Sequence, residues 1–230
     1  MYNVLQTPIF GIVVTIVFYA IGLYIQKKTK LAVFNPLLIA ILGIILFLKV
    51  SHISYASYKM GGDSINFFLS PVTIVLAIPL YKQYDLLKKH LYEIVIGITT
   101  GVVASFISII AISKITHSDQ IIMNSLLGKS ITTPMGISLT SSLGGIESIT
   151  IVAIILTGIV GAMVATPIFK FINTTHPVSK GIALGTASHA LGTTKALELG
   201  EIEGAMSGLA IGISGTITVI LIPILIKFLG

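Results

Sequence analysis

Long apolar runs alternate with short polar segments along most of the chain. An α-helix needs about 20 consecutive apolar residues to cross the hydrocarbon core of a bilayer. The runs lie at residues 5–25, 31–50, 67–81, 91–115, 149–172 and 205–229. The pattern predicts an all-α, polytopic integral membrane protein with about six full spans.

The composition supports this interpretation. Of the 230 residues, 54% are hydrophobic and 10% are charged, and the mean hydropathy is +1.02, whereas a soluble domain carries about 25% charged residues. We therefore expect one transmembrane domain over residues 1–230, in contact with the lipid bilayer. Residues 1–30 are expected to be a retained first span and a basic loop, because no basic segment or cleavage site marks a signal peptide.

All fourteen basic residues are lysines, and they lie at the ends of apolar runs. Proteins that bind nucleic acid usually combine arginine with aromatic residues, so the net charge of +6 indicates membrane topology and no nucleic-acid partner. If the first four runs all cross, the lysines at 27–30 and 82–89 share one side, which is then cytoplasmic. The absence of cysteine excludes disulfides and thiol catalysis.

Two segments, 119–147 and 178–203, are only moderately apolar and carry their polar residues in the middle. Irregular backbone at membrane depth is tolerated only where it faces protein or a water-filled cavity. If both segments cross, Lys170 and Lys180 fall outside, against the positive-inside rule, whereas re-entrant hairpins place both in the cytoplasm. We favour hairpins, with full crossing as the alternative.

An offset of 56 residues aligns these segments and the spans that follow, giving two copies at 119–172 and 175–228. The matched pairs include Gly136 with Gly192, Glu147 with Glu203, and Pro167 with Pro223. If each copy is a hairpin plus one span, the second copy is upside down, and such inverted repeats are typical of secondary transporters. The alternative is a pair of ordinary kinked helices with similar packing glycines.

The first interrupted segment contains a lysine beside a predicted helix start. Thr133 followed by Pro134 is typical of a helix N-terminus, whose free N–H groups attract anions, and Lys129 adds a full positive charge. We expect an anion-binding site formed by Lys129, Ser130, Thr132 and Thr133. Alternatively, Lys129 extends to the membrane interface and Thr133-Pro134 is only a kink.

The second interrupted segment gathers hydroxyl groups around a histidine. The residues expected to bind substrate there are Thr186, Ser188, His189, Gly192 and Thr193. His189 is a candidate for binding the anion or for carrying a proton, since imidazole titrates near working pH. The alternative is a hydrogen-bonded packing residue. Lys195 lies nearer the end of the segment, where we expect it to extend to the interface.

The chain carries no pattern that indicates an enzyme. Glu147 and Glu203 are matched in the two copies, but their place just before a span favours helix capping or a gate over acid–base chemistry. The sequence contains no phosphate-binding loop, zinc-ligand spacing or nucleophile–base pair. We therefore expect no catalytic residue, no metal and no cofactor.

Several of these motifs resemble those of one family of membrane proteins. They lie at residues 35–39, 58–62, 77–82, 129–134, 143–146 and 181–200. The last, with its Gly-Thr-Ala-Ser-His-Ala-Leu-Gly-Thr core, is the most specific. The chain is similar to the LrgB/CidB (antiholin-like) family over residues 35–228, and more to LrgB than to CidB.

The resemblance implies a multi-pass protein of the bacterial cytoplasmic membrane and two functional alternatives. One is a carrier of short carboxylates, such as pyruvate in bacteria or glycolate and glycerate in a plastid relative. The other is a holin/antiholin-type regulator of murein hydrolase activity and autolysis, acting with a small LrgA-type partner. Two paired, polar, helix-breaking centres favour a specific transport site, so we predict a transporter of pyruvate- or glycolate-type monocarboxylates. A homodimer is expected, because it is common among carriers of this size.

Overall fold

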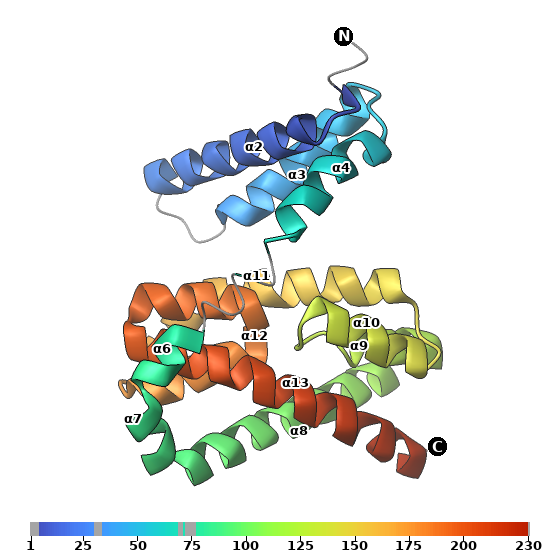
Figure 1. Ribbon diagram of the computed structural model, residues 1–230. Coiled ribbons are helices and arrows are strands. Elements are labelled where there is room, and N and C mark those ends of the chain that lie inside the picture. The colour runs from blue at the N-terminus through green and yellow to red at the C-terminus, as the bar shows by residue number, and fades with distance from the viewer. Residues whose placement is uncertain (1–4, 30–33, 69–70, 72–76, 230) are drawn as a thin grey trace. The chain divides into compact units, whose positions relative to one another are not determined.

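The computed structural model describes residues 5–29, 34–68, 71 and 77–229, and all regular secondary structure in these ranges is helical (Figure 1). Four of the described helices are long and apolar enough to cross a membrane by length and composition. They are α2 (Pro8–Thr29), α8 (Leu91–Ile115), α11 (Glu147–Phe171) and α13 (Glu201–Leu229). The all-α prediction is confirmed, and these helices agree with a polytopic membrane protein.

The other two predicted spans differ from expectation. Helix α3 (Pro36–Val50) is apolar but has only 15 residues. At its start, Asn35 accepts hydrogen bonds from two backbone amides and Pro36 occupies the first helical position. The predicted span at 67–81 falls largely on residues 69–70 and 72–76, which lie outside the described residues.

The chain divides into two units, residues 1–75 and 76–230, and each is described by itself. The first contains α2, α3 and α4 (Tyr55–Asn66), a helix that the polar stretch at 51–66 did not suggest. Glycines allow α4 to approach α2 closely: a Cβ atom on Gly61 would lie 2.5 Å from the Gly11 Cα. The Thr15 hydroxyl lies 3.0 Å from the Tyr58 hydroxyl across the same contact.

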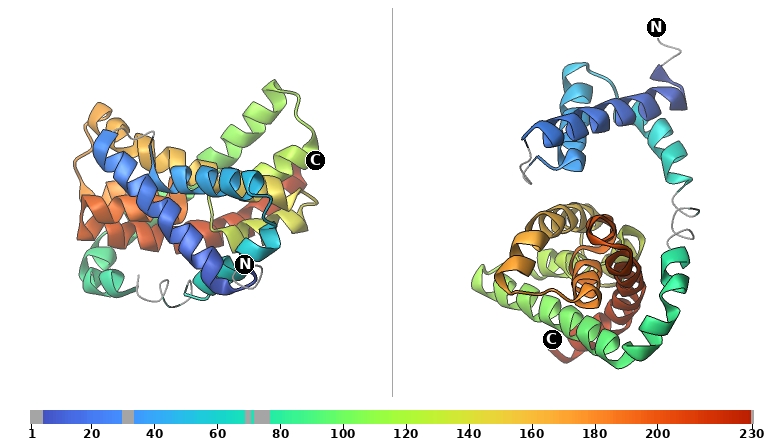
Figure 2. Two further views of the ribbon diagram at one scale, coloured as in Figure 1. Left: turned by 90° about the horizontal axis from the view of Figure 1, so that it is seen from above. Right: turned by 90° about the vertical axis from the view of Figure 1, so that its left-hand side faces the viewer.

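The second unit contains the remaining helices. Besides α8, α11 and α13 they are α6 (Ala77–Lys82), α7 (Tyr84–Lys89), α9 (Gln120–Leu126), α10 (Thr133–Ser142) and α12 (Pro177–Leu199). Helices α8 and α13 cross each other, as the further views show (Figure 2). Buried apolar side chains such as Ile98 of α8 and Met206 of α13 fill the space between them.

Helices α9 and α10 form a hairpin. The Asn124 side-chain amide donates to the Leu143 carbonyl at 2.6 Å, which ties α9 to the residue that follows α10. Near the reversal, a Cβ atom on Gly128 would lie only 3.0 Å from the Gly136 Cα. The first interrupted segment therefore folds back on itself instead of continuing as one helix.

Helix α12 also folds back on itself. Its backbone leaves the helical region at His189, where φ is 43° and ψ is −132°. Beyond this break, Gly192 packs against the Leu184 carbonyl, and a Cβ atom there would lie 2.8 Å from the Ser188 Cβ. Residues eight apart in a straight helix are separated by about 12 Å. The two halves of α12 thus form a second hairpin, which packs on α11 and α13.

Two contacts made by the hairpins, one within each hairpin and one to the long helix that follows, recur at the spacing of the sequence repeat. Each of the two has a counterpart 56 residues later. The corresponding pairs are Gly128–Gly136 with Leu184–Gly192, and Ser125–Thr150 with Gly181–Met206. The glycine pattern therefore encodes the same local packing twice.

Candidate functional site

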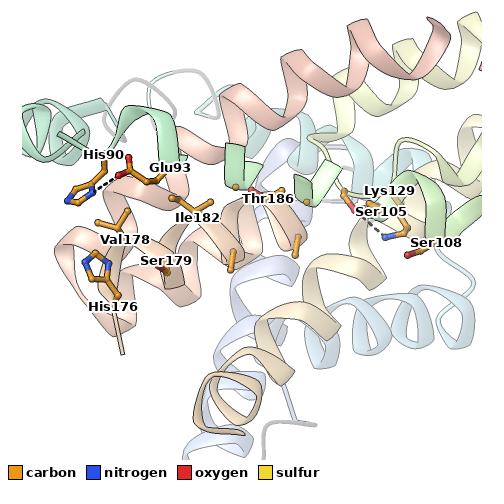
Figure 3. Close-up of a pocket in the computed structure, with 15 residues that line it drawn as sticks. His90, Glu93, Ser105, Ser108, Lys129, His176, Val178, Ser179, Ile182 and Thr186 are labelled. Carbon is orange, nitrogen blue, oxygen red and sulfur yellow. Dashed lines mark hydrogen bonds and ion pairs between the residues drawn. The ribbon is translucent and has the colours of Figure 1, made fainter. Parts of the chain in front are cut away.

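A groove of about 780 Å³ runs between α8 and α12 and reaches the loop between α9 and α10 (Figure 3). Its mouth is lined by His90 and by the exposed Glu93 and His176, and the half-buried Lys129 lies at its other end. The α8 residues along it run from Glu93 to Ser108, a length of roughly 22 Å at 1.5 Å per residue. The groove thus follows most of the length of a candidate span.

Small residues on one face of α8 leave room for the groove. Gly97, Gly101, Ser105 and Ser108 all line it and are three or four positions apart, which places them on one side of the helix. A Cβ atom on Gly101 would lie 2.9 Å from the Thr186 Cγ2, so any larger side chain there would press on α12. This spacing is the sequence signal that could have located the groove wall.

The deep end of the groove combines one positive charge with hydroxyl groups. The half-buried Lys129 ammonium donates to the Ser130 hydroxyl at 3.1 Å, and the Ser130 oxygen lies 3.4 Å from the Ser105 oxygen. Among the described residues, no carboxylate forms an ion pair with Lys129. A cation without a counter-ion beside a groove attracts an anionic ligand.

The predicted helix start lies beside this charge. Helix α10 begins at Thr133, with Thr132 as its N-cap and Pro134 in the first turn, so the start is confirmed to within one residue. The Thr132 hydroxyl makes no capping hydrogen bond. Neither threonine lines the groove, although both are partly exposed.

Residues of the second hairpin face two ways. Thr186 and Ala187 line the groove, whereas His189 is buried against α11. The His189 Nε2 lies 2.9 Å from the Ile154 carbonyl, and a carbonyl only accepts, so Nε2 carries the proton and donates it. The ring occupies the space left by Gly158, where a Cβ atom would lie 2.7 Å from Cε1.

The other predicted residues of this hairpin also make internal contacts. Ser188 packs against Gly161 of α11. The Thr193 hydroxyl donates to the His189 carbonyl at 3.2 Å and lies 2.8 Å from the Ser207 hydroxyl of α13. Their side chains hold the break against its neighbours.

The structure brings three predicted site residues together at one cavity, namely Lys129, Ser130 and Thr186. The other six do not line it: Thr132, Thr133, Ser188, His189, Gly192 and Thr193. Sequence reasoning missed the α8 wall and the residues at the mouth. At the mouth, the His90 and His176 rings are 6.0 Å apart, and the His90 Nδ1 lies 3.9 Å from the Glu93 carboxylate.

The matched glutamates lie at the starts of the two long helices. Glu147 is the first residue of α11 and accepts a hydrogen bond from the Ser141 hydroxyl at 2.6 Å. Glu203 lies in the first turn of α13, with its carboxylate against Gly200. Both positions suit interaction with the positive end of a helix dipole.

Comparison with known proteins covers nearly the whole chain. The profile of the LrgB-like family matches residues 15–228. Proteins named "Antiholin-like protein LrgB" from Bacillus cereus (strain B4264) and Bacillus anthracis (strain A0248) are each 40% identical to it over 226 residues, which is 98% of this chain and 98% of each relative. No solved structure is significantly similar. By sequence, and in agreement with its four apolar helices, the chain belongs to the LrgB-like family of membrane proteins.

Proposed function

We propose that this protein carries small monocarboxylate anions of the pyruvate or glycolate type across the membrane. The observation that carries the proposal is Lys129, a half-buried ammonium group at the deep end of the groove that has no acidic partner in the part of the chain that the structure describes. A charge at membrane depth costs at least about 2.5–3.5 kcal/mol on insertion scales, so it is retained where it has a function. A bound carboxylate would supply the negative charge that balances the Lys129 ammonium group.

The groups at this end match the chemistry of a carboxylate. Its oxygens only accept hydrogen bonds, and the Lys129 ammonium and the Ser130 and Ser105 hydroxyls can donate them. The acidic residue of the groove, Glu93, lies at the mouth, away from Lys129 (Figure 3). The electrostatic character of the deep end therefore favours a small anion over a cation.

The depth of this site within the spans fits a carrier. Ser105 lies 14 residues after the start of α8 and ten before its end, or about 21 Å and 15 Å along the helix. The hydrocarbon core is about 30 Å thick, so a span in this position holds Ser105 near its middle. Substrate sites of secondary transporters lie near the bilayer midplane, between broken helices.

The two hairpins supply a mechanism for alternating access. With each hairpin re-entering from its own side, the copies at 119–172 and 175–228 have inverted topologies. The mouth of the groove lies beside α7, which carries Lys88 and Lys89, so the positive-inside rule makes this an inward-facing state. Movement of the hairpins against α8 and α13 would close this mouth and open the opposite side of Lys129.

Uptake of labelled pyruvate and glycolate into proteoliposomes tests this proposal. We expect saturable uptake by the wild-type protein and a large loss for Lys129→Ala. Lys195→Ala is the matched control, because Lys195 pairs with Glu198 at 2.7 Å and does not line the groove. Equal uptake by wild type and Lys129→Ala would rule out this site.

The relatives named antiholin-like favour a second candidate. The family resemblance implies that this would be a holin/antiholin-type regulator of murein hydrolase activity and autolysis in the bacterial cytoplasmic membrane. This function requires no saturable flux. It predicts leakage of liposomes that depends on an LrgA-type partner, so flux and leakage assays with and without that partner separate the candidates. The same preparations report whether the protein is a homodimer.

A further inference from the structure

One buried hydroxyl group of the second hairpin lacks a hydrogen-bond partner. Thr186 is 8% exposed. Among the described residues, its Oγ1 is the one buried side-chain oxygen or nitrogen atom that has no hydrogen-bond partner. Other helical hydroxyls of this unit, such as those of Thr99 and Thr194, donate to the carbonyl four residues earlier. The Thr186 hydroxyl makes no such bond, so its hydrogen-bonding capacity remains available to a ligand.

Thr186 also lines a second, much smaller cavity. Four more hydroxyl residues line it, from α8, from the first hairpin and from α13: Ser105, Ser130, Ser214 and Thr218. Its volume is about 10 Å³, which is roughly the space of one water molecule or one oxygen substituent. Phe106 and Ile222 form apolar walls, so the polar groups converge on a single small position.

The small cavity adjoins the proposed anion site. Ser105, Ser130 and Thr186 line both the groove and the small cavity, and Ser130 accepts a hydrogen bond from Lys129. A carboxylate bound by Lys129 and Ser130 therefore places its neighbouring carbon atom beside the small cavity. An oxygen on that carbon can enter the cavity and bond to Thr186.

We infer that the Thr186 hydroxyl selects acids that carry a hydroxyl or keto oxygen on the carbon next to the carboxylate. The inference rests on the proposed transport function. A water molecule fits the cavity when no acid is bound. The oxygen of a 2-hydroxy or 2-oxo acid displaces that water and forms a hydrogen bond in its place. A methyl group also displaces the water but forms no hydrogen bond, so it binds more weakly.

Glycolate and propionate provide a direct test, because they differ by a hydroxyl in place of a methyl group. We expect the wild-type protein in proteoliposomes to prefer glycolate by about tenfold or more in kcat/KM. Thr186→Val keeps the shape of the side chain and removes the hydroxyl, so the preference should fall to near unity. Thr186→Ser should retain the preference and thereby show that the hydroxyl, not the threonine methyl, is responsible.

Thr194→Val is the matched control, because this threonine is on the same hairpin but outside both cavities. It should leave the preference unchanged. An unchanged preference in Thr186→Val, or an equal loss for both acids, would overturn the selectivity role while leaving the carrier function intact. Absence of saturable flux for both acids in the wild type would overturn the proposed function and this inference with it.

Discussion

The two hairpins of the second unit close with equivalent contacts 56 residues apart, yet the polar side chains at their two breaks have different surroundings. In the first, Lys129 and Ser130 face the groove. In the second, His189 and Thr193 bond to the neighbouring backbone and to α13. A polar residue at a helix break is therefore not by itself a sign of a binding site, because the break also needs polar groups to hold it in place.

The difference follows from how each break is built. The first break has six residues between α9 and α10, and backbone groups satisfy part of its hydrogen bonding, as in the bond from the Lys129 amide to the Leu126 carbonyl. Lys129 and Ser130 bond to each other and line the groove, where a ligand can reach them. The second break occurs at one non-glycine residue with positive φ, a conformation that costs of order 1–3 kcal/mol. The His189 side chain helps to hold this conformation by its bond to Ile154.

His189→Ala should have the largest effect on stability. The substitution removes the ring that fills the space beside Gly158 and leaves the Ile154 carbonyl without its partner. Together these losses should lower the free energy of unfolding by about 3–5 kcal/mol, measurable by denaturant titration in mixed micelles. His189→Gln retains a donor and should recover part of the loss. A stable His189→Ala protein with weakened substrate binding would instead place His189 in the site.

Lys129→Met should show the opposite pattern, a functional loss with little structural cost. The substitution removes a charge that has no ion-pair partner in the described ranges, so we expect unchanged or slightly higher stability. Uptake of a monocarboxylate should fall roughly a hundredfold, the usual scale for losing a buried charged partner. Parallel uptake and unfolding measurements on Lys129→Met and His189→Ala would separate the roles of the two breaks. A Lys129→Met protein that unfolds easily would contradict this separation.

Sequence patterns predicted much of the fold because its causes are local. Length and apolarity identified the four long helices, and Thr133-Pro134 located the start of α10 to within one residue. The repeat paired Gly136 with Gly192, and both lie where a hairpin closes. These features depend on short-range chemistry that one sequence displays directly.

The direction of side chains at the breaks could not be predicted in the same way. A regular helix repeats its faces every 3.6 residues, but that periodicity stops where the helix stops. Whether Ser188 and His189 face α11 or the groove depends on the space that Gly158 and Gly161 leave on another helix. Likewise, α4 was missed because its stability depends on packing against α2 through Gly11 and Gly61.

The closing glycines should be sensitive to a single added methyl group in both hairpins. Gly136→Ala and Gly192→Ala each place a Cβ against neighbouring atoms, Ile154 in one and the Leu184 carbonyl in the other. We expect each to lower the free energy of unfolding by about 1–3 kcal/mol. Gly212→Ala is the control, since no atom lies near its added Cβ. Helix propensity should make that variant neutral or more stable by up to about 1 kcal/mol.

A similar loss of unfolding free energy for Gly136→Ala and Gly192→Ala would support equivalent packing in the two copies. If only one of the two variants is destabilised, the hairpins do not share a folding plan, and their correspondence at 56 residues is limited to sequence. The denaturant titration used for His189 gives all three values on one scale. Purified yield and the size-exclusion profile report whether a variant fails to assemble before any titration.

The smallest effects should come from the matched glutamates. Glu147→Gln and Glu203→Gln keep the side-chain size and remove a negative charge at the start of α11 or α13. Each should cost about 0.3–1 kcal/mol at low salt, less at high salt, with unchanged KM for the carried acid. If either variant raises KM, that glutamate acts as a gate.

Glu198→Gln distinguishes a helix-dipole effect from a general effect of net charge. All three substitutions raise the net charge of the protein by one, but Glu198 lies at the C-terminal end of α12. A carboxylate there opposes the helix dipole, and its removal also breaks an exposed pair with Lys195 at 2.7 Å, which contributes little. We therefore expect Glu198→Gln to be near neutral. Equal destabilisation by all three substitutions would mean that the added positive charge, not the position at a helix start, lowers the stability. The two matched glutamates would then have no special role in either copy.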